Sequence, residues 1–333
     1  MTDSTCVVFS PPGKVELVSV TLPEVSAGKV LVETLFSGVS PGTESRCLRG
    51  EQVGVGTNQC IAGYQAVGRV LKAGPGVDRS AGELVFFSQA ESVPGFINFN
   101  GCHTQRAVVQ DSKLHSLPED AILAEAALGK ICAVALHGIE CARLQPGESV
   151  IVVGLGLLGQ LSARIAKSRR AQVVALDRQP GRVEVARAAG IAAHISGAKL
   201  SESLGVDRDG FDVIIDATGA VPLISQCVEL ARDLQPWEAP TRQGSRYIIQ
   251  GSYAGEFRFD YTSAFMKELN IIVPRDHTDA DLAAALEMIY QLELPLADIV
   301  GEPVSPELAP EIYADLGSPE ATRLTAVFDW SRL

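Results

Sequence analysis

The chain lacks the cysteine spacing of a zinc cluster or a redox motif. Its seven cysteines are scattered, and no two of them form a Cys-x-x-Cys pair. Structural zinc clusters and thioredoxin-like sites both depend on such pairs. An odd, dispersed set of thiols therefore argues against both and is typical of a reducing compartment.

Positive charge and long apolar runs are also scarce. The 28 Lys and Arg residues against 40 Asp and Glu give a net charge of -12, without any basic run. This balance argues against nucleic acid and anionic membrane partners. The first residues lack the features of a secretory signal, and no apolar run approaches the length of a membrane span. We expect a cytoplasmic protein that binds small molecules.

The 333 residues, 46% of them hydrophobic, suffice for two domains. In the first third, short β-type runs separated by Gly, Pro and Ser favour a barrel-like domain. Helical spacing predicts one long helix over Asp120–Ala142. From Ser149 onward strands and helices alternate, which predicts a doubly wound parallel sheet. The expected strands are 15–20, 30–35, 67–71, 84–87, 107–109, 150–153, 173–176, 192–195, 213–216, 247–250, 271–273 and 324–329; the expected later helices are 181–189, 221–232 and 279–290.

A Gly-x-Gly-x-x-Gly turn follows the expected strand 150–153. Gly154 permits the tight turn, Gly156 lets a pyrophosphate approach the backbone, and Gly159 lets the helix pack closely. The following helix, with Leu157 and Leu158 at its start, offers N–H groups to phosphates. The pattern predicts a dinucleotide site.

Asp177 ends the next expected strand, where it can accept hydrogen bonds from both ribose hydroxyls. A carboxylate there repels the 2′-phosphate of NADP, so NAD is the favoured cofactor. The adjacent Arg178 leaves an alternative open, because it could pair with that phosphate or stack on adenine.

Four segments together resemble the medium-chain dehydrogenase/reductase superfamily: Gly63–Val70, Ala126–Ala142, Gly154–Gly159 and Asp216–Gly219. The motif Ser37–Glu44 resembles the subgroup that contains bacteriochlorophyllide a dehydrogenase, whose members lack zinc. The resemblance implies a GroES-like catalytic domain, residues 1–121 plus 284–333, around a Rossmann domain, residues 122–283. It also implies a homodimer.

The same resemblance implies further cofactor contacts after the later strands. Thr218 and Gly219 would lie near the adenosine, and Gln250, Gly251 and Ser252 near the nicotinamide ribose. Arg323 matches an arginine that contacts the pyrophosphate in zinc-containing relatives; the alternative is a surface salt bridge.

Three positions that bind zinc in those relatives carry other residues here. Ser40 stands for the cysteine, Tyr64 for the histidine, and Lys130 for the third ligand or nearby acid. Hydroxyl, phenol and ammonium groups do not form a useful zinc shell. We therefore expect no zinc.

Without a metal, hydrogen-bond donors or a cation must stabilise the developing oxyanion of a carbonyl substrate. Lys130, in an otherwise apolar helix, is the first candidate, and Tyr64 is the second. The alternative for Lys130 is a lysine at a domain edge whose ammonium reaches solvent. The alternative for Tyr64 is a side chain that only lines the wall of the pocket. Thr43 and Glu44 match the region where relatives relay protons, although Glu44 could instead brace its loop.

Two histidines and two loops complete the predicted site. His277 follows a strand end that should face the nicotinamide, so a ligand contact and a solvated loop are both open. His103 is expected to pack in the interior. The loops 50–62 and 89–100 are expected to wall the substrate pocket, and the loop 235–245 is expected to lie away from the cofactor.

The leading prediction is a zinc-independent oxidoreductase that transfers a hydride between NAD(H) and a secondary alcohol or ketone. Lys130 or Tyr64 would handle the proton. One alternative is an NADPH-dependent enone or quinone reductase, and another is a non-catalytic NAD-binding protein. The sequence carries no code for the substrate.

Overall fold

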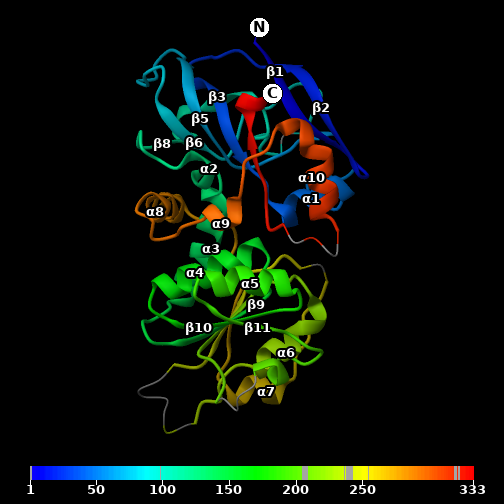
Figure 1. The fold of residues 1–333 in the computed structure, drawn as a ribbon, viewed down its shortest axis with the longest axis vertical. Coiled ribbons are helices and arrows are strands. Elements are labelled where there is room, and N and C mark those ends of the chain that lie inside the picture. The colour runs from blue at the N-terminus through cyan, green and yellow to red at the C-terminus, as the bar shows by residue number, and fades with distance from the viewer. Residues whose placement is uncertain are drawn as a thin grey trace. The chain divides into compact units, whose positions relative to one another are not determined.

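The computed structural model describes residues 2–97, 99–204, 209–235, 237, 243–253, 255–318, 321 and 323–333. The chain forms two compact units (Figure 1). The first comprises Met1–Ile131 and Leu282–Leu333, and the second comprises Cys132–Asp281. Most of the loop 235–245 lies outside the described residues.

Antiparallel sheets form the first unit. A small sheet has the strand order β2-β1-β4, and a larger one has the order β15-β3-β5-β6-β8, with β7 also paired to β3. Buried apolar residues, mostly valines, at alternate positions of these strands pack together on one face of the larger sheet, as the short β-type runs predict. The strands are β1 Asp3–Ser10, β2 Lys14–Thr21, β3 Lys29–Gly38, β4 Cys60–Ile61, β5 Ala66–Ala73, β6 Leu84–Phe87, β7 Arg106–Gln110, β8 Leu114–Ser116 and β15 Val327–Asp329.

The prediction of one long helix over Asp120–Ala142 is wrong. The chain forms α2 (Leu123–Ala126), turns, and then forms α3 (Gly129–Ala142). The break lies where the backbone packs tightly, because a Cβ on Gly38 would come within 2.5 Å of the Ala127 carbonyl oxygen. Tertiary packing therefore overrides helical periodicity at this point. The other helices that lie wholly or partly in this unit are α1 Pro41–Arg49, α8 Asp279–Tyr290, α9 Ala297–Val300 and α10 Ala309–Leu316.

The second unit is the predicted doubly wound parallel sheet. Its strand order is β11-β10-β9-β12-β13-β14. From β9 the chain adds β10 and β11 on one side, and then returns to add β12, β13 and β14 on the other side of β9. Helices α4 and α5 cover one face, and α6 and α7 lie on the other (Figure 1). Ligands of such sheets bind beyond the carboxyl ends of the strands at the reversal. The strands are β9 Ser149–Val153, β10 Gln172–Asp177, β11 Ala192–Ile195, β12 Val213–Asp216, β13 Arg246–Ile249 and β14 Asn270–Ile272; the helices are α4 Leu157–Ser168, α5 Pro180–Ala188, α6 Ile224–Glu229 and α7 Tyr261–Met266.

The predicted helix 221–232 is shorter than expected. A 3₁₀ turn over Val221–Leu223 leads into α6, which ends at Glu229. Beyond that point the backbone pairs with Phe211, whose N–H donates to the Leu230 carbonyl and whose carbonyl accepts from Arg232. Those hydrogen bonds replace the helical ones.

Within the described part of the chain, the helices are too short or too polar to span a bilayer.

Candidate functional site

The glycine turn between β9 and α4 has little room for any side chain. Gly154 adopts a φ of 89°, a conformation that favours glycine. A Cβ on Gly159 would lie 1.8 Å from the Gly154 carbonyl oxygen, so only glycine fits there. Gly156 is the N-cap of α4, and no side chain caps this end of the helix. The free N–H groups of Leu157 and Leu158 are therefore suited to a phosphate.

Asp177 is buried at the carboxyl end of β10, beside this turn. Its carboxylate accepts hydrogen bonds from the N–H groups of Leu155 at 2.6 Å and Gln179 at 2.8 Å. The two bonds fix the carboxylate against the glycine turn, where a nucleotide ribose would lie. The buried Asp177 carboxylate, the glycine turn and the start of α4 thus fit a dinucleotide.

Arg182 also belongs to this group, and the sequence analysis missed it. Its guanidinium lies 3.9 Å from the Asp177 carboxylate and 3.9 Å from the position of a Cβ on Gly156. Arg178, the predicted alternative, is exposed. The position of Arg182 in the first turn of α5, directly after Asp177, is the signal that could have revealed it.

We expect Asp177→Ala to narrow the preference for NAD(H) over NADP(H). The substitution removes the acceptor for the ribose hydroxyls and the repulsion of a 2′-phosphate, while Arg182 remains as a cation. Calorimetric titration of both cofactors into the wild type, Asp177→Ala and the control Arg178→Ala measures the change. A wild type that binds NADPH more tightly would contradict this assignment.

The ends of β12 and β13 lie against the glycine turn. A Cβ on Gly154 would come within 3.0 Å of Thr218 Cγ2, so the turn and this strand end touch. Gly219 and Gly251 are also in close contact, since a Cβ on Gly251 would lie 2.7 Å from the Gly219 nitrogen. The structure therefore gathers the predicted residues of these strand ends, Thr218, Gly219, Gly251 and Ser252.

Gln250 has its side chain directed into α3. Its amide nitrogen donates to the Val134 and Ala135 carbonyls, and its oxygen accepts from Ser162 at 2.7 Å. These bonds occupy the side-chain amide. A contact of Gln250 with the cofactor, which stays a prediction, would therefore involve its backbone.

In the first unit, the three residues at the zinc-ligand positions converge. The Tyr64 hydroxyl donates to Ser40 Oγ at 2.5 Å, and Lys130 Nζ lies 5.2 Å from the centre of the Tyr64 ring. Tyr64 and Ser40 are buried, whereas Lys130 is half-buried. A cation over an aromatic face is favourable and fixes the relative position of the two groups.

Gln65 holds this group from behind. Its amide nitrogen lies 3.4 Å from the Gly38 carbonyl, and its oxygen accepts from the Ile131 N–H at 3.0 Å. It thereby connects the end of β3, just before Ser40, to the start of α3, which carries Lys130. Its full burial leaves these bonds without competition from water.

Thr43 and Glu44 lie in the first turn of α1 but differ in environment. Glu44 is buried and accepts from the Tyr313 hydroxyl at 2.6 Å, with His103 Nε2 at 3.4 Å. Thr43 is half-buried and lies 3.5 Å from a guanidinium nitrogen of Arg46. These contacts favour the bracing role for Glu44; a proton relay through either residue stays a prediction.

Two further predicted residues lie beside carboxylates that are close to them in sequence. His277 Nδ1 lies 2.6 Å from the neighbouring Asp276 carboxylate. Arg323 Nε lies 3.3 Å from the Asp315 carboxylate. This contact is a surface salt bridge, the alternative role that the sequence leaves open for Arg323. Their predicted contacts with substrate and pyrophosphate stay predictions.

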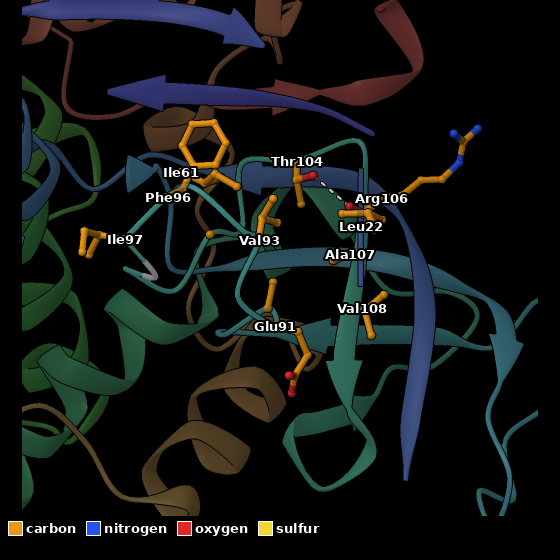
Figure 2. Close-up of a pocket in the computed structure, with 12 residues that line it drawn as sticks. Leu22, Ile61, Glu91, Val93, Phe96, Ile97, Thr104, Arg106, Ala107 and Val108 are labelled. Atoms are coloured by element: carbon orange, nitrogen blue, oxygen red, sulfur yellow. Dashed lines mark hydrogen bonds between the residues drawn. The ribbon is translucent and has the colours of Figure 1, made fainter. Parts of the chain in front are cut away.

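The loops 50–62 and 89–100 meet, because the Ile97 N–H donates to the Gln59 carbonyl at 2.9 Å. Figure 2 shows a narrow pocket that Ile61, Phe96 and Ile97 help to line. Its free volume of about 10 Å³ holds about one water molecule. Neither Tyr64 nor Lys130 lines this pocket, so we do not assign it to the substrate.

No protein-family model matches the chain. The chain is 27% identical over 337 residues to 2-desacetyl-2-hydroxyethyl bacteriochlorophyllide A dehydrogenase from Cereibacter sphaeroides, and the alignment covers 98% of each protein. It is 26% identical over 227 residues to D-xylulose reductase A from Aspergillus oryzae, and that alignment covers 66% of this chain and 61% of that protein.

Solved structures share the fold over the whole length. A structure described as a "putative zinc-binding dehydrogenase" from Sinorhizobium meliloti, bound to NADP, has a TM-score of 0.83 at 19% identity, covering 99% of this chain and 100% of that one. Acetophenone reductase from Geotrichum candidum in complex with NAD has a TM-score of 0.81 at 17% identity, covering 99% and 98%. The chain therefore has the fold of the medium-chain dehydrogenase/reductase superfamily.

The chain carries a donor set that does not suit zinc. Zinc prefers thiolate, imidazole or carboxylate ligands, whereas Ser40, Tyr64 and Lys130 offer a hydroxyl, a phenol and an ammonium. Over the described ranges, there is no group of three or more His, Cys, Asp or Glu side chains that could hold a metal ion. The residues present therefore fit a dinucleotide but not a zinc ion at the superfamily's catalytic position.

Proposed function

We propose that this chain transfers a hydride between NAD(H) and a secondary alcohol or its ketone without zinc. The reaction class, NAD(P)-dependent oxidation of CH–OH groups by an alcohol dehydrogenase-like enzyme, is that of the relatives. The observation that supports the metal-free form is the group of Tyr64, Ser40 and Lys130. It offers one cation and a short chain of hydroxyls where zinc relatives place their metal.

Each part of the site has its own role in the proposed reaction. The N–H groups at the start of α4 hold the pyrophosphate, and Asp177 holds the ribose hydroxyls. The nicotinamide, when bound, supplies or accepts the hydride. During ketone reduction the Lys130 ammonium stabilises the developing oxyanion, and Lys130 Nζ or the Tyr64 hydroxyl delivers the proton. Ser40, which accepts a hydrogen bond from Tyr64, holds the phenol in position.

The proposal is tested by following nicotinamide absorbance over a panel of secondary alcohols, ketones and enones with NAD(H) and NADP(H). We expect turnover of an alcohol–ketone pair with NAD(H). Reduction of enones with NADPH alone would establish the rival reductase. Cofactor binding without turnover across the panel would favour the non-catalytic alternative.

We also propose that the chain forms a homodimer through β14. This strand lies at the edge of the parallel sheet, next to β13. The backbone of Asn270 is directed towards β13, because its N–H donates to the Ser245 carbonyl. Successive residues of a strand alternate, so the backbone groups of Ile271 and Val273 face outward. Both side chains are well exposed, at 39% and 62%. A second copy related by a two-fold axis presents the same edge and can complete these hydrogen bonds.

Ile271→Lys is expected to convert the dimer into a monomer, because edge lysines oppose strand pairing. Light scattering after size exclusion gives the mass directly, and Lys72→Met serves as a surface control. A wild-type monomer, or a dimer unchanged by Ile271→Lys, would refute this interface.

A further inference from the structure

We propose that His103 is the positioning residue for the Tyr64–Ser40 hydrogen bond. Its imidazole is fully buried and contacts the chain on both sides of that bond. The inference rests on the proposed function, because it assigns a role to a residue that acts through Tyr64. The sequence predicts only interior packing for His103.

The first contact holds the Tyr64 side of the bond. Gly63, directly before Tyr64, adopts a φ of 85°, and a Cβ there would lie 2.5 Å from His103 Cγ. The imidazole therefore packs directly on the Gly63 backbone. The His103 N–H also donates to the Ala62 carbonyl at 2.8 Å, so ring and backbone together fix the approach to Tyr64.

The other contacts hold the Ser40 side. His103 Nδ1 is 2.8 Å from the hydroxyl of Ser37, which lies three residues before Ser40. His103 Nε2 is 3.4 Å from Glu44, whose own N–H donates to the Ser40 carbonyl at 3.0 Å. One imidazole thus connects the residues on either side of Ser40 to the residue before Tyr64.

Polar groups contact both nitrogens of the ring. The Trp330 indole N–H can only donate, and it donates to Ser37 Oγ at 2.8 Å. Ser37 Oγ thus lies between the Trp330 indole and His103 Nδ1, and His103 Nε2 faces the Glu44 carboxylate. The contacts among Trp330, Ser37, His103 and Glu44 therefore hold the imidazole at both of its nitrogens.

The Tyr313 hydroxyl is a further donor to Glu44. Burial and the nearby Glu44 raise the pKa of the Tyr313 hydroxyl well above its usual value, so that hydroxyl stays protonated and donates. Burial, together with Cys60 and Glu44, raises the pKa of the Cys47 thiol to about 12. Among the described atoms, Glu44 Oε1 has no hydrogen-bond partner, so the donors on Oε2 alone orient this carboxylate.

A double-mutant cycle on Tyr64 and His103 tests the assignment, using a substrate from the panel. His103→Leu should lower kcat by about 10²-fold, the cost of displacing a reacting group by about 1 Å. KM should change less than about twofold. In the Tyr64→Phe background the same substitution should cost nothing further, because its effect passes through Tyr64.

Two more variants keep the test decisive. His103→Gln retains a donor near the position of Nε2 and should recover part of the lost rate, whereas the control His194→Gln should leave kcat unchanged. His103→Gln serves as the test variant if thermal unfolding shows that His103→Leu does not fold. Equal losses in the wild-type and Tyr64→Phe backgrounds would mean that His103 does not act through Tyr64, and would overturn the assignment. If Tyr64→Phe alone has no effect, this inference fails while a dehydrogenase that uses Lys130 stands. If the wild type turns over nothing, the proposed function itself fails.

Discussion

Lys130→Met is expected to lower turnover by about 10²–10³-fold, the loss seen when one donor to a developing oxyanion is removed. Methionine matches the aliphatic stem of lysine, so the half-buried site should keep its packing and the protein its fold. Cofactor affinity should stay near that of the wild type, because the residues predicted to hold the dinucleotide's ribose and phosphates are in the other unit. Single-turnover hydride transfer isolates the chemical step from product release.

Three comparisons support this test of Lys130. Lys130→Arg should restore little activity, since a guanidinium stays protonated and cannot exchange a proton. The pH profile of alcohol oxidation should lose one limb in the Met variant if lysine is the proton carrier. Lys72→Met, an exposed surface control, should leave the rate unchanged. If Lys130→Met transfers hydride at the wild-type rate, the lysine has no catalytic role and Tyr64 is left to handle the proton.

Gly159→Ala is expected to destabilise the second unit by about 3 kcal/mol or more and to abolish tight cofactor binding. The new methyl group would lie 1.8 Å from the Gly154 carbonyl oxygen. Because the obstacle is backbone rather than a flexible side chain, α4 must move away from the turn, which is a severe form of overpacking. Urea unfolding and cofactor titration measure both effects.

Gly156→Ala provides the matched comparison within the same turn. A Cβ there meets nothing closer than Arg182, at 3.9 Å, so the fold should remain stable. Its methyl group would still obstruct a pyrophosphate that approaches the backbone, so cofactor affinity alone should fall. Gly197→Ala should change neither property, because a Cβ there would make only an ordinary contact of 3.8 Å with Ser203 Oγ. A Gly159→Ala protein with wild-type stability would show that α4 can shift at little cost.

The dinucleotide site was the part most readily predicted from sequence, because its constraints are local. The glycine spacing and the acid after the next strand follow from backbone sterics over a short stretch of chain, and the structure gathers them around Gly154 and Asp177. Arg182 was missed because its closeness to Gly156 depends on how α5 folds back towards the turn. A search one helical turn beyond Asp177 would have found it.

Other features depend on contacts between distant residues, which periodicity does not report. The break between α2 and α3 follows from packing of Ala127 on Gly38, nearly ninety residues earlier in the chain. The connection from Glu44 to Tyr313 joins positions 269 residues apart. For the same reason His103 offered no functional signal in the sequence. Its role is visible only once Ser37, Glu44 and Gly63 surround one ring.

The zinc content of the active enzyme tests the central claim most directly. The purified protein is dialysed against a chelator, and its zinc is then measured by elemental analysis alongside its NAD-dependent alcohol oxidation. We predict far less than one zinc per chain with activity retained, because Ser40, Tyr64 and Lys130 cannot form a zinc shell. One tightly bound zinc per chain, lost together with activity on chelation, would contradict the proposed metal-free chemistry.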